Sequence, residues 1–177
     1  MSGRSFEGTV LPHLDAAFNY ARWLTRSDVE AEEVVQDACI RALRFFSNLR
    51  GEDARAWLLA IVRNAYFARG PRHVDVFTPL PPDESRVPAD HDPSPLSPEA
   101  LVIQQETVKQ VHQALERLPV EFREAIVLRE LEGLAYKEIA VVTAVPIGTV
   151  MSRLARGRER LLAILAADVD VKEEVRS

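Results

Sequence analysis

A cluster of prolines in the middle of the chain limits how this sequence can fold. Between residues 71 and 98 lie eight of the eleven prolines: Pro71, Pro79, Pro81, Pro82, Pro88, Pro93, Pro95 and Pro98. Proline fixes its backbone angle φ and has no amide hydrogen to donate, and this stretch carries few large apolar side chains. The pattern predicts a flexible linker over 71–98 between two folded parts, residues 1–70 and 99–167, followed by an acidic tail over 168–177.

The composition favours a soluble protein with one medium or two small cores, because 47% of the 177 residues are hydrophobic. The longest apolar runs, residues 56–62 and 161–167, fall far short of the roughly 20 residues of a membrane-spanning helix. The amino terminus lacks the apolar centre of a secretory signal. The single cysteine, Cys39, excludes an intrachain disulfide and a multi-thiolate zinc site. We expect a cytoplasmic protein without a membrane span, metal or cofactor.

The part before the linker predicts three helices and no strands. Apolar residues repeat at helical spacing over about 11–24, 35–46 and 57–65. Ser27 precedes Asp28-Val29-Glu30 and can form a capping box at the start of the second helix. Asp53 can cap the third helix after a loop over residues 47–52. Trp57 and Phe46 fall at core positions of these helices.

The part after the linker predicts four helices, which makes the fold class all-α. Ser97-Pro98-Glu99 is typical of a helix start, with a capping hydroxyl and a proline in the first turn. Pro119 starts the next helix, which ends near Gly133. Two shorter helices follow at about 135–143 and 148–165, and we expect the tail from Asp168 onward to fray.

The last two helices have the pattern of a helix-turn-helix. Ile139 and Ala140 of the first helix are expected to be buried, with Val150 and Leu154 of the second packed against them. The outer face then presents donors that can reach base edges and phosphates: Thr149, Ser152, Arg153 and Arg156. The alternative is a plain helical hairpin with a solvated arginine face. It is disfavoured because Arg153, Arg156, Arg158 and Arg160 repel one another unless a polyanion or carboxylates face them.

Two blocks of residues, one on each side of the linker, resemble conserved regions two and four of bacterial RNA polymerase sigma factors. The first block comprises Ala31-Glu32-Glu33-Val34-Val35-Gln36-Asp37 and Ala56-Trp57-Leu58, with Ile61, Arg63 and Asn64. The second comprises Leu118-Pro119, Arg123, Leu128-Arg129-Glu130, Glu132-Gly133-Leu134 and the helix-turn-helix. Helix-turn-helix patterns alone are common, but these two blocks across a proline-rich tether are specific. The chain resembles the small extracytoplasmic-function type, which keeps only these two regions.

The resemblance implies three groups of site residues. Residues that grip the clamp helices of the largest polymerase subunit would be Glu33, Gln36 and Asp37. Residues that melt and read the minus-ten element would be Asn48, Arg50, Arg63, Asn64 and Phe67, with Arg69 as a further candidate. Residues at the minus-thirty-five element would be Lys137, Thr149, Met151, Ser152, Arg153, Arg156 and Arg158. Many relatives carry a basic residue where Met151 stands.

The function implied is that of a sigma factor, which directs RNA polymerase core to specific promoters. The implied partners are the core enzyme, through its clamp helices and flap region, promoter DNA, and an anti-sigma factor. We expect a monomer when free, and no enzyme activity, since the four histidines are scattered. Two alternatives are a dimeric helix-turn-helix regulator that binds a palindrome without polymerase, and an interaction protein with no DNA role.

Two small residues carry expectations about the backbone. Ala144 occupies a turn position that is often glycine, and alanine would be strained there if its φ is positive. Gly157 lies inside the last helix, where glycine costs roughly 0.5–1 kcal/mol of stability relative to alanine.

Overall fold

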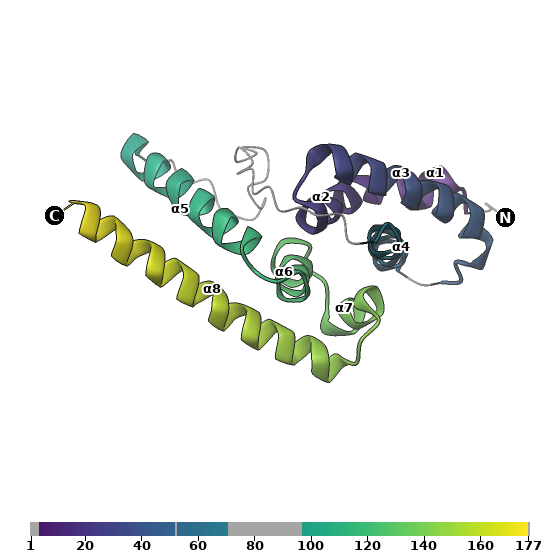
Figure 1. The fold of residues 1–177 in the computed structure, drawn as a ribbon. Helices are drawn as coiled ribbons and strands as arrows, with labels where there is room; N and C mark the ends of the chain where they lie inside the picture. The colour runs from purple at the N-terminus through teal and green to yellow at the C-terminus, as the bar shows by residue number, and fades with distance from the viewer. Residues whose placement is uncertain (1–3, 52, 71–96, 177) are drawn as a thin grey trace.

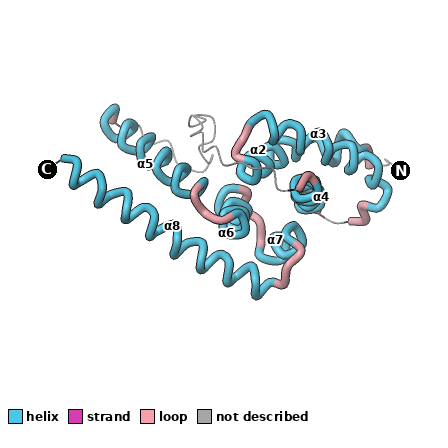
Figure 2. Tube along the Cα trace, viewed as in Figure 1, coloured by secondary structure: helices cyan, strands magenta, loops and turns pink. Residues whose placement is uncertain are grey.

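The computed structural model describes residues 4–51, 53–70 and 97–176, and all regular structure within them is helical (Figures 1 and 2). The first half contains α1 (Phe6–Val10), η1 (Leu11–His13), α2 (Leu14–Thr25), α3 (Asp28–Phe45), η2 (Phe46–Asn48) and α4 (Ala54–Ala68). The second half contains α5 (Pro98–Glu116), α6 (Val120–Ile126), η3 (Val127–Leu131), α7 (Tyr136–Thr143) and α8 (Ile147–Arg176). The all-α fold class is confirmed. The predicted linker lies outside the described residues, apart from its last two positions.

Three helices begin at the capping residues that the sequence indicates. The Ser27 hydroxyl accepts a hydrogen bond from the Glu30 amide at the start of α3. The Asp53 carboxylate accepts one from the Arg55 amide at 2.9 Å, at the start of α4. Ser97 does the same for α5, with Pro98 in the first turn. Each cap satisfies an amide that has no partner within its own helix.

The two halves pack directly against each other, which the linker pattern did not suggest. Helix α4 lies against α7, and α2 lies against α6 (Figure 1). The buried apolar side chains of both halves form one continuous cluster, in which Leu58 and Leu59 belong to the first half and Leu128 and Ile139 to the second. The inner faces of α2 and α4 are therefore covered by the second half of the chain.

Helix α8 continues to Arg176, so the predicted helix end near 165 and the expected fraying from Asp168 onward are wrong. No glycine or proline follows Gly157, and nothing in that stretch breaks a helix. The long helix runs beside α5 (Figure 1). Arg117 of α5 pairs with Asp168 at 2.9 Å, and Lys172 pairs with Glu106 at 3.6 Å. Asp168, one of the acidic residues that suggested a solvated tail, instead faces a cation on the neighbouring helix.

Gly157 has a packing role that its helix propensity does not reveal. It is buried where α8 crosses α6. A Cβ atom at this position would lie 3.0 Å from Cδ1 of Ile126 and 3.2 Å from Cβ of Phe122. The close approach of the two helices therefore requires a residue without a side chain.

We predict that Gly157→Ala lowers the free energy of unfolding by about 1–2 kcal/mol, because overpacking outweighs the gain in helix propensity. Gly148→Ala is the matched control, since no atom lies within 4 Å of a Cβ built there. The control should leave stability unchanged or raise it by up to about 1 kcal/mol. Urea unfolding followed by circular dichroism measures both. A Gly157→Ala variant as stable as the Gly148→Ala variant would contradict the packing role.

Ala144 adopts the left-handed conformation at the end of α7, with φ of 54°, so the expected backbone strain is present. Ala144→Gly should raise the free energy of unfolding by roughly 0.5–1 kcal/mol, because relief of strain exceeds the added entropy of the unfolded chain. Ala155→Gly, at an exposed helical position of α8, should instead lower it by about 1 kcal/mol. Thermal and urea unfolding measure the two changes, and a loss of stability in both variants would argue against strain at Ala144.

Candidate nucleic-acid and partner interface

The helix-turn-helix packs largely as its sequence pattern predicts, but Ala140, which was expected to be buried, is half-buried. Helices α7 and α8 meet at 98°. Ile139, Val150 and Leu154 are all buried between them and the rest of the core. At the turn, the Pro146 carbonyl accepts hydrogen bonds from the amides of Thr149 and Val150 at 2.9 and 3.1 Å. This geometry holds the first turns of α8 on the surface of the protein.

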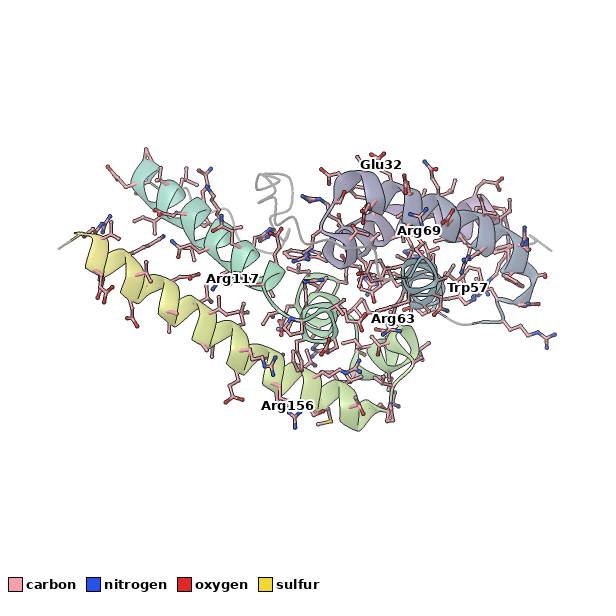
Figure 3. All side chains as sticks on the ribbon, in the orientation of Figure 1. Glu32, Trp57, Arg63, Arg69, Arg117 and Arg156 are labelled. Carbon is pink, nitrogen blue, oxygen red and sulfur yellow. The ribbon has the colours of Figure 1, made fainter. Side chains whose placement is uncertain are left out.

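The exposed face of α8 carries a subset of the predicted minus-thirty-five residues. Met151, Ser152 and Arg156 are exposed on α8, and Lys137 is exposed on α7. Figure 3 shows Arg156 pointing away from the body of the protein. Thr149 is half-buried, and its carbonyl accepts a hydrogen bond from the Ser152 hydroxyl at 3.1 Å. This face combines a cation, a hydroxyl and an apolar side chain.

The other arginines of α8 are engaged within the protein. Arg158 donates to Glu130 at 2.6 Å, and this hydrogen bond raises the pKa of Arg158 above its usual value. The Arg160 guanidinium lies 4.7 Å from the centroid of the Phe122 ring. Arg153 Nη1 lies 3.9 Å from a Glu124 oxygen, and its side chain is only 25% exposed. The expectation that Arg153 lies on the outer face is therefore wrong, because Glu124 draws it inward. Of the four, Arg156 alone has no partner within the described part of the chain.

The predicted minus-ten residues also divide into exposed and buried sets. Asn48 and Arg50 are exposed around η2, and Asn64 and Phe67 are exposed on α4. Arg63 differs, because its guanidinium lies at the junction of the two halves (Figure 3). It stacks 4.5 Å from the Phe67 ring centroid while its nitrogens donate to Glu124 of the other half.

Glu124 of α6 is the centre of a buried polar cluster and is only 1% exposed. The Tyr20 hydroxyl of α2 donates to its Oε2 at 2.8 Å. Arg63 of α4 donates from Nε to Oε2 at 2.9 Å and from Nη2 to Oε1 at 3.0 Å. Burial opposes the charge on Arg63, yet the hydrogen bonds and negative charge of Glu124 raise its pKa. The carboxylate is thus satisfied by donors from the opposite half.

Glu124 and Tyr20 are functional candidates that the sequence patterns did not indicate. The available signal was the position of Glu124, which comes directly before the apolar run Ala125-Ile126-Val127-Leu128 and two residues after Phe122. A charge at such a position requires a buried partner. Nothing local indicates that the partners lie 104 and 61 residues away.

The environment of Tyr20 predicts a measurable loss of stability at alkaline pH. Burial, together with the negative charge of Glu124, raises the pKa of Tyr20 well above its usual value of 10.0. The folded chain therefore keeps a phenolic proton that the unfolded chain releases above about pH 10. The stability that this group contributes below pH 10 is lost as the pH rises further. Urea unfolding across this range should show a shallower loss in Tyr20→Phe, and identical slopes in both proteins would contradict the assignment.

The predicted polymerase-binding residues form a surface on α3 that also holds an internal cation. Arg69, at the end of α4, pairs with Glu33 at 3.0 Å and with Asp37 at 3.2 Å. Gln36 is exposed beside them. In Figure 3 Arg69 lies beneath α3, whereas Glu32 points outward. The two carboxylates remain partly exposed, so they are accessible to a basic partner that replaces or joins Arg69.

Exposed apolar side chains extend this acidic surface, and the sequence patterns did not select them. Val29 and Ile40 lie one helical turn on either side of Glu33 and Gln36, and both are largely exposed. Leu43 continues the same stretch of α3. Exposed apolar groups next to charges are typical of protein-binding surfaces. Together these residues form a mixed acidic and apolar surface on α3.

Other kinds of site find little support within the described ranges. No three His, Cys, Asp or Glu side chains there are grouped so as to hold a metal ion. No single helix there has the length and hydropathy to cross a membrane, and α7 with α8 reaches that measure only as a sharply bent pair. Cys39 is half-buried, and burial raises its pKa.

Comparisons with known proteins match both halves of the chain. Residues 9–68 match the family model for Sigma-70 region 2, and residues 109–161 match the model for Sigma-70, region 4. The RNA polymerase sigma-H factor of Pseudomonas aeruginosa is 35% identical over 164 residues, covering 89% of this chain and 84% of that protein. The ECF RNA polymerase sigma factor SigE of Mycolicibacterium smegmatis is 35% identical over 163 residues. That match covers 92% of this chain but only 62% of the relative.

The fold also matches a solved structure. The sigma factor RpoE in complex with the anti-sigma factor NepR from Bartonella quintana has a TM-score of 0.67 and 27% identity to this chain. The match covers 92% of this chain and 98% of that one. It extends over the helices of both halves.

Proposed function

This chain belongs to the extracytoplasmic-function family of RNA polymerase sigma factors, and we propose that it directs the core polymerase to specific promoters and starts transcription there. The proposal is supported by the match of one chain to both sigma regions. Each matched half also has an exposed surface that could bind a partner. The region 2 half has the acidic and apolar surface of α3. The region 4 half has the exposed face of α8. Members of this family are transcription initiation factors.

The exposed face of α8 is proposed to read the minus-thirty-five element. Arg156 has the reach and geometry for a bidentate contact with guanine, and Lys137 for a backbone phosphate. Met151 stands where many relatives carry a basic residue, and its apolar side chain suits contact with the methyl group of thymine. Ser152 and Thr149 lie beside them on the first turns. Arg153 and Arg158 reach DNA only after leaving Glu124 and Glu130.

The exposed residues around η2 and α4 are proposed to capture the minus-ten element. Melting needs no catalytic group, but it needs a surface that holds a base after it leaves the stack. Phe67 offers an exposed ring, and stacking is worth about 1–3 kcal/mol per base. Asn48, Arg50 and Asn64 supply exposed hydrogen-bonding groups nearby. Arg63 joins them when it leaves Glu124.

The surface of α3 is proposed to bind the clamp helices of the largest polymerase subunit. Glu33, Gln36 and Asp37 present acidic and amide groups that complement a basic partner, and Val29 and Ile40 add apolar contact area. The region 4 half would in turn approach the flap region. The two weak contacts then act together, because one polymerase holds both at a high effective concentration.

We further propose that an anti-sigma factor binds this chain and holds it inactive, because the similar sigma factor from Bartonella quintana is in complex with the anti-sigma factor NepR. The free chain is then a monomer that acts in the cytoplasm, where polymerase and promoters meet. It has no enzymatic role of its own, since polymerase supplies the chemistry. Affinity purification of the endogenous chain should recover a dedicated small partner before induction. Recovery only with polymerase, or alone, would contradict this part.

Run-off transcription tests the main proposal. Core polymerase supplied with this chain should start RNA synthesis at defined sites in a genomic promoter library, whereas core alone should not. The rival reading, a dimeric regulator, predicts a dimer by size-exclusion chromatography and binding to a palindrome without polymerase. No defined start site with an active core preparation would contradict the proposed function.

A further inference from the structure

The contact between the two halves has a polar centre rather than only an apolar one. Glu124 is buried there, with Tyr20 and Arg63 of the first half as its hydrogen-bond donors. Around this centre, Arg123 Nη2 lies 3.5 Å from the Leu24 carbonyl, a second polar link across the junction. The apolar side chains at this junction do not need a charged residue at their centre. Removing a carboxylate from water is unfavourable unless it is fully paired.

Two arginines from opposite halves converge on the same carboxylate. Arg63 binds both Glu124 oxygens with a pair of parallel hydrogen bonds at 2.9 and 3.0 Å. Arg153 approaches Oε1 from α8, with Nη1 at 3.9 Å. A bidentate arginine fork is also the geometry with which guanidinium groups bind phosphate. These are the arginines that sequence resemblance assigns to the minus-ten element in one half and to the minus-thirty-five element in the other.

We propose that Glu124 acts as an internal substitute for a DNA phosphate and holds the chain in a closed, DNA-excluding form by engaging Arg63 and Arg153 at once. The DNA part of this inference rests on the proposed function, whereas the closure itself does not. In the closed form both guanidinium groups face Glu124 rather than nucleic acid. Separation of the two halves releases Arg63. It also uncovers Arg153 and Glu124, which lie in the same half, so that a phosphate can take the place of the carboxylate beside Arg153.

The contacts of Glu124 differ in strength between the two halves of the chain. Tyr20 and Arg63 make short, well-formed hydrogen bonds with Glu124. Arg153 Nη1, by contrast, is buried without any hydrogen bond within the described structure. A buried donor without an acceptor is unfavourable, so a phosphate that offers Arg153 a hydrogen bond competes well with Glu124. We call the contact of Glu124 with Tyr20, Arg63 and Arg153 the latch. It is stable in the free chain, yet it opens when a better anion and a polymerase surface are present.

The latch is distinct from a general effect of charge. The chain has a net charge of −5, which by itself repels DNA. If net charge alone kept the free chain from DNA, removing any single carboxylate near α8 would have the same small effect. If Glu124 is a latch, its removal alone frees two arginines and separates the halves. The two explanations differ in which glutamate matters.

Glu124→Gln in the full-length chain tests the proposal, with Glu130→Gln as the matched control. Both variants remove one charge from the second half, and both release an arginine of α8 from its partner. Within the described residues, the side chain of Glu130 makes no hydrogen bond or ion pair with the first half. The measurements are the radius of gyration by small-angle X-ray scattering and the affinity for a double-stranded DNA fragment without polymerase.

Glu124→Gln should increase the radius of gyration and tighten DNA binding by roughly tenfold or more, because two arginines become free for phosphate contacts. Glu130→Gln should leave the radius unchanged and alter binding only a few-fold. Tyr20→Phe removes a single hydrogen bond while keeping the ring, and it should give a smaller change in the same direction. Circular dichroism verifies that each variant keeps its helices, so the proposal remains testable if Glu124→Gln unfolds.

An unchanged radius of gyration in both Glu124→Gln and Tyr20→Phe would overturn the latch, as would a wild-type chain that is already extended in solution. Equal gains in DNA binding for the Glu124 and Glu130 variants would overturn it in favour of net charge. If transcription starts normally but no variant opens, the latch fails while the proposed function stands. If the variants open but no promoter responds to the chain, the closure stands and the proposed function fails.

Discussion

Replacing Arg156 with alanine is expected to reduce transcription from cognate promoters by about 10- to 100-fold, which corresponds to the roughly 1–3 kcal/mol of one bidentate base contact. Arg156 is exposed on the outer face of α8 and has no partner within the described part of the chain (Figure 3). Its guanidinium therefore requires no internal contact to break before it meets DNA. The effect should appear in run-off transcription and should depend on the bases of the upstream element.

Arg160→Ala is the matched control for this prediction. Arg160 lies four residues further along α8, but its guanidinium stacks on the ring of Phe122. Its loss should alter stability slightly and promoter choice very little. If Arg156→Ala is as active as Arg160→Ala on the same promoters, the exposed face of α8 does not read DNA.

Reversing two charges on α3, with Glu33→Lys and Asp37→Lys together, is expected to weaken binding to core polymerase by about 100-fold. Like charges placed together at an interface cost several kcal/mol, and the proposed clamp surface is basic. Both carboxylates are partly exposed, so the change acts on the surface rather than on the core. Fluorescence anisotropy of the labelled chain titrated with core polymerase measures the affinity.

The control is Arg69→Ala, which removes the internal partner of both carboxylates but leaves the acidic surface intact. It should bind core polymerase at least as tightly as the wild type, because Arg69 no longer competes for the carboxylates. An equal loss of affinity in Arg69→Ala would mean that the ion pairs only support the fold. Normal affinity in the charge-reversed variant would exclude this surface as the polymerase contact.

Local features of the fold could be predicted from sequence because they depend on neighbours along the chain. A capping residue such as Asp53 acts on amides two or three positions away. The helix-turn-helix follows from apolar spacing, and Val150 and Leu154 are buried as that spacing indicates. The strain at Ala144 could be anticipated for the same reason, since a short turn between two helices favours a left-handed residue.

The features that could not be predicted from the sequence depend on contacts between distant segments. The pairing of Glu124 with Tyr20 and Arg63 depends on how the two halves meet, and no local pattern encodes that geometry. Helix propensity alone makes Gly157 unfavourable, and its packing role could not be predicted because the nearby Ile126 and Phe122 belong to another helix. The helical tail was missed because its acidic residues were read as solvated, whereas Asp168 faces Arg117 of α5. The exposed residues of the candidate site could therefore be identified from the sequence. The contacts of Arg63 and Arg153 with the buried Glu124 could not.

The most direct test of the whole account compares the affinity of this chain for one promoter fragment with and without core polymerase. The free chain should bind the promoter no better than a scrambled fragment. With core present, the same promoter should be preferred over the scrambled one by about 1,000-fold. Tight and sequence-specific binding by the chain alone, with no gain on adding core, would contradict the account.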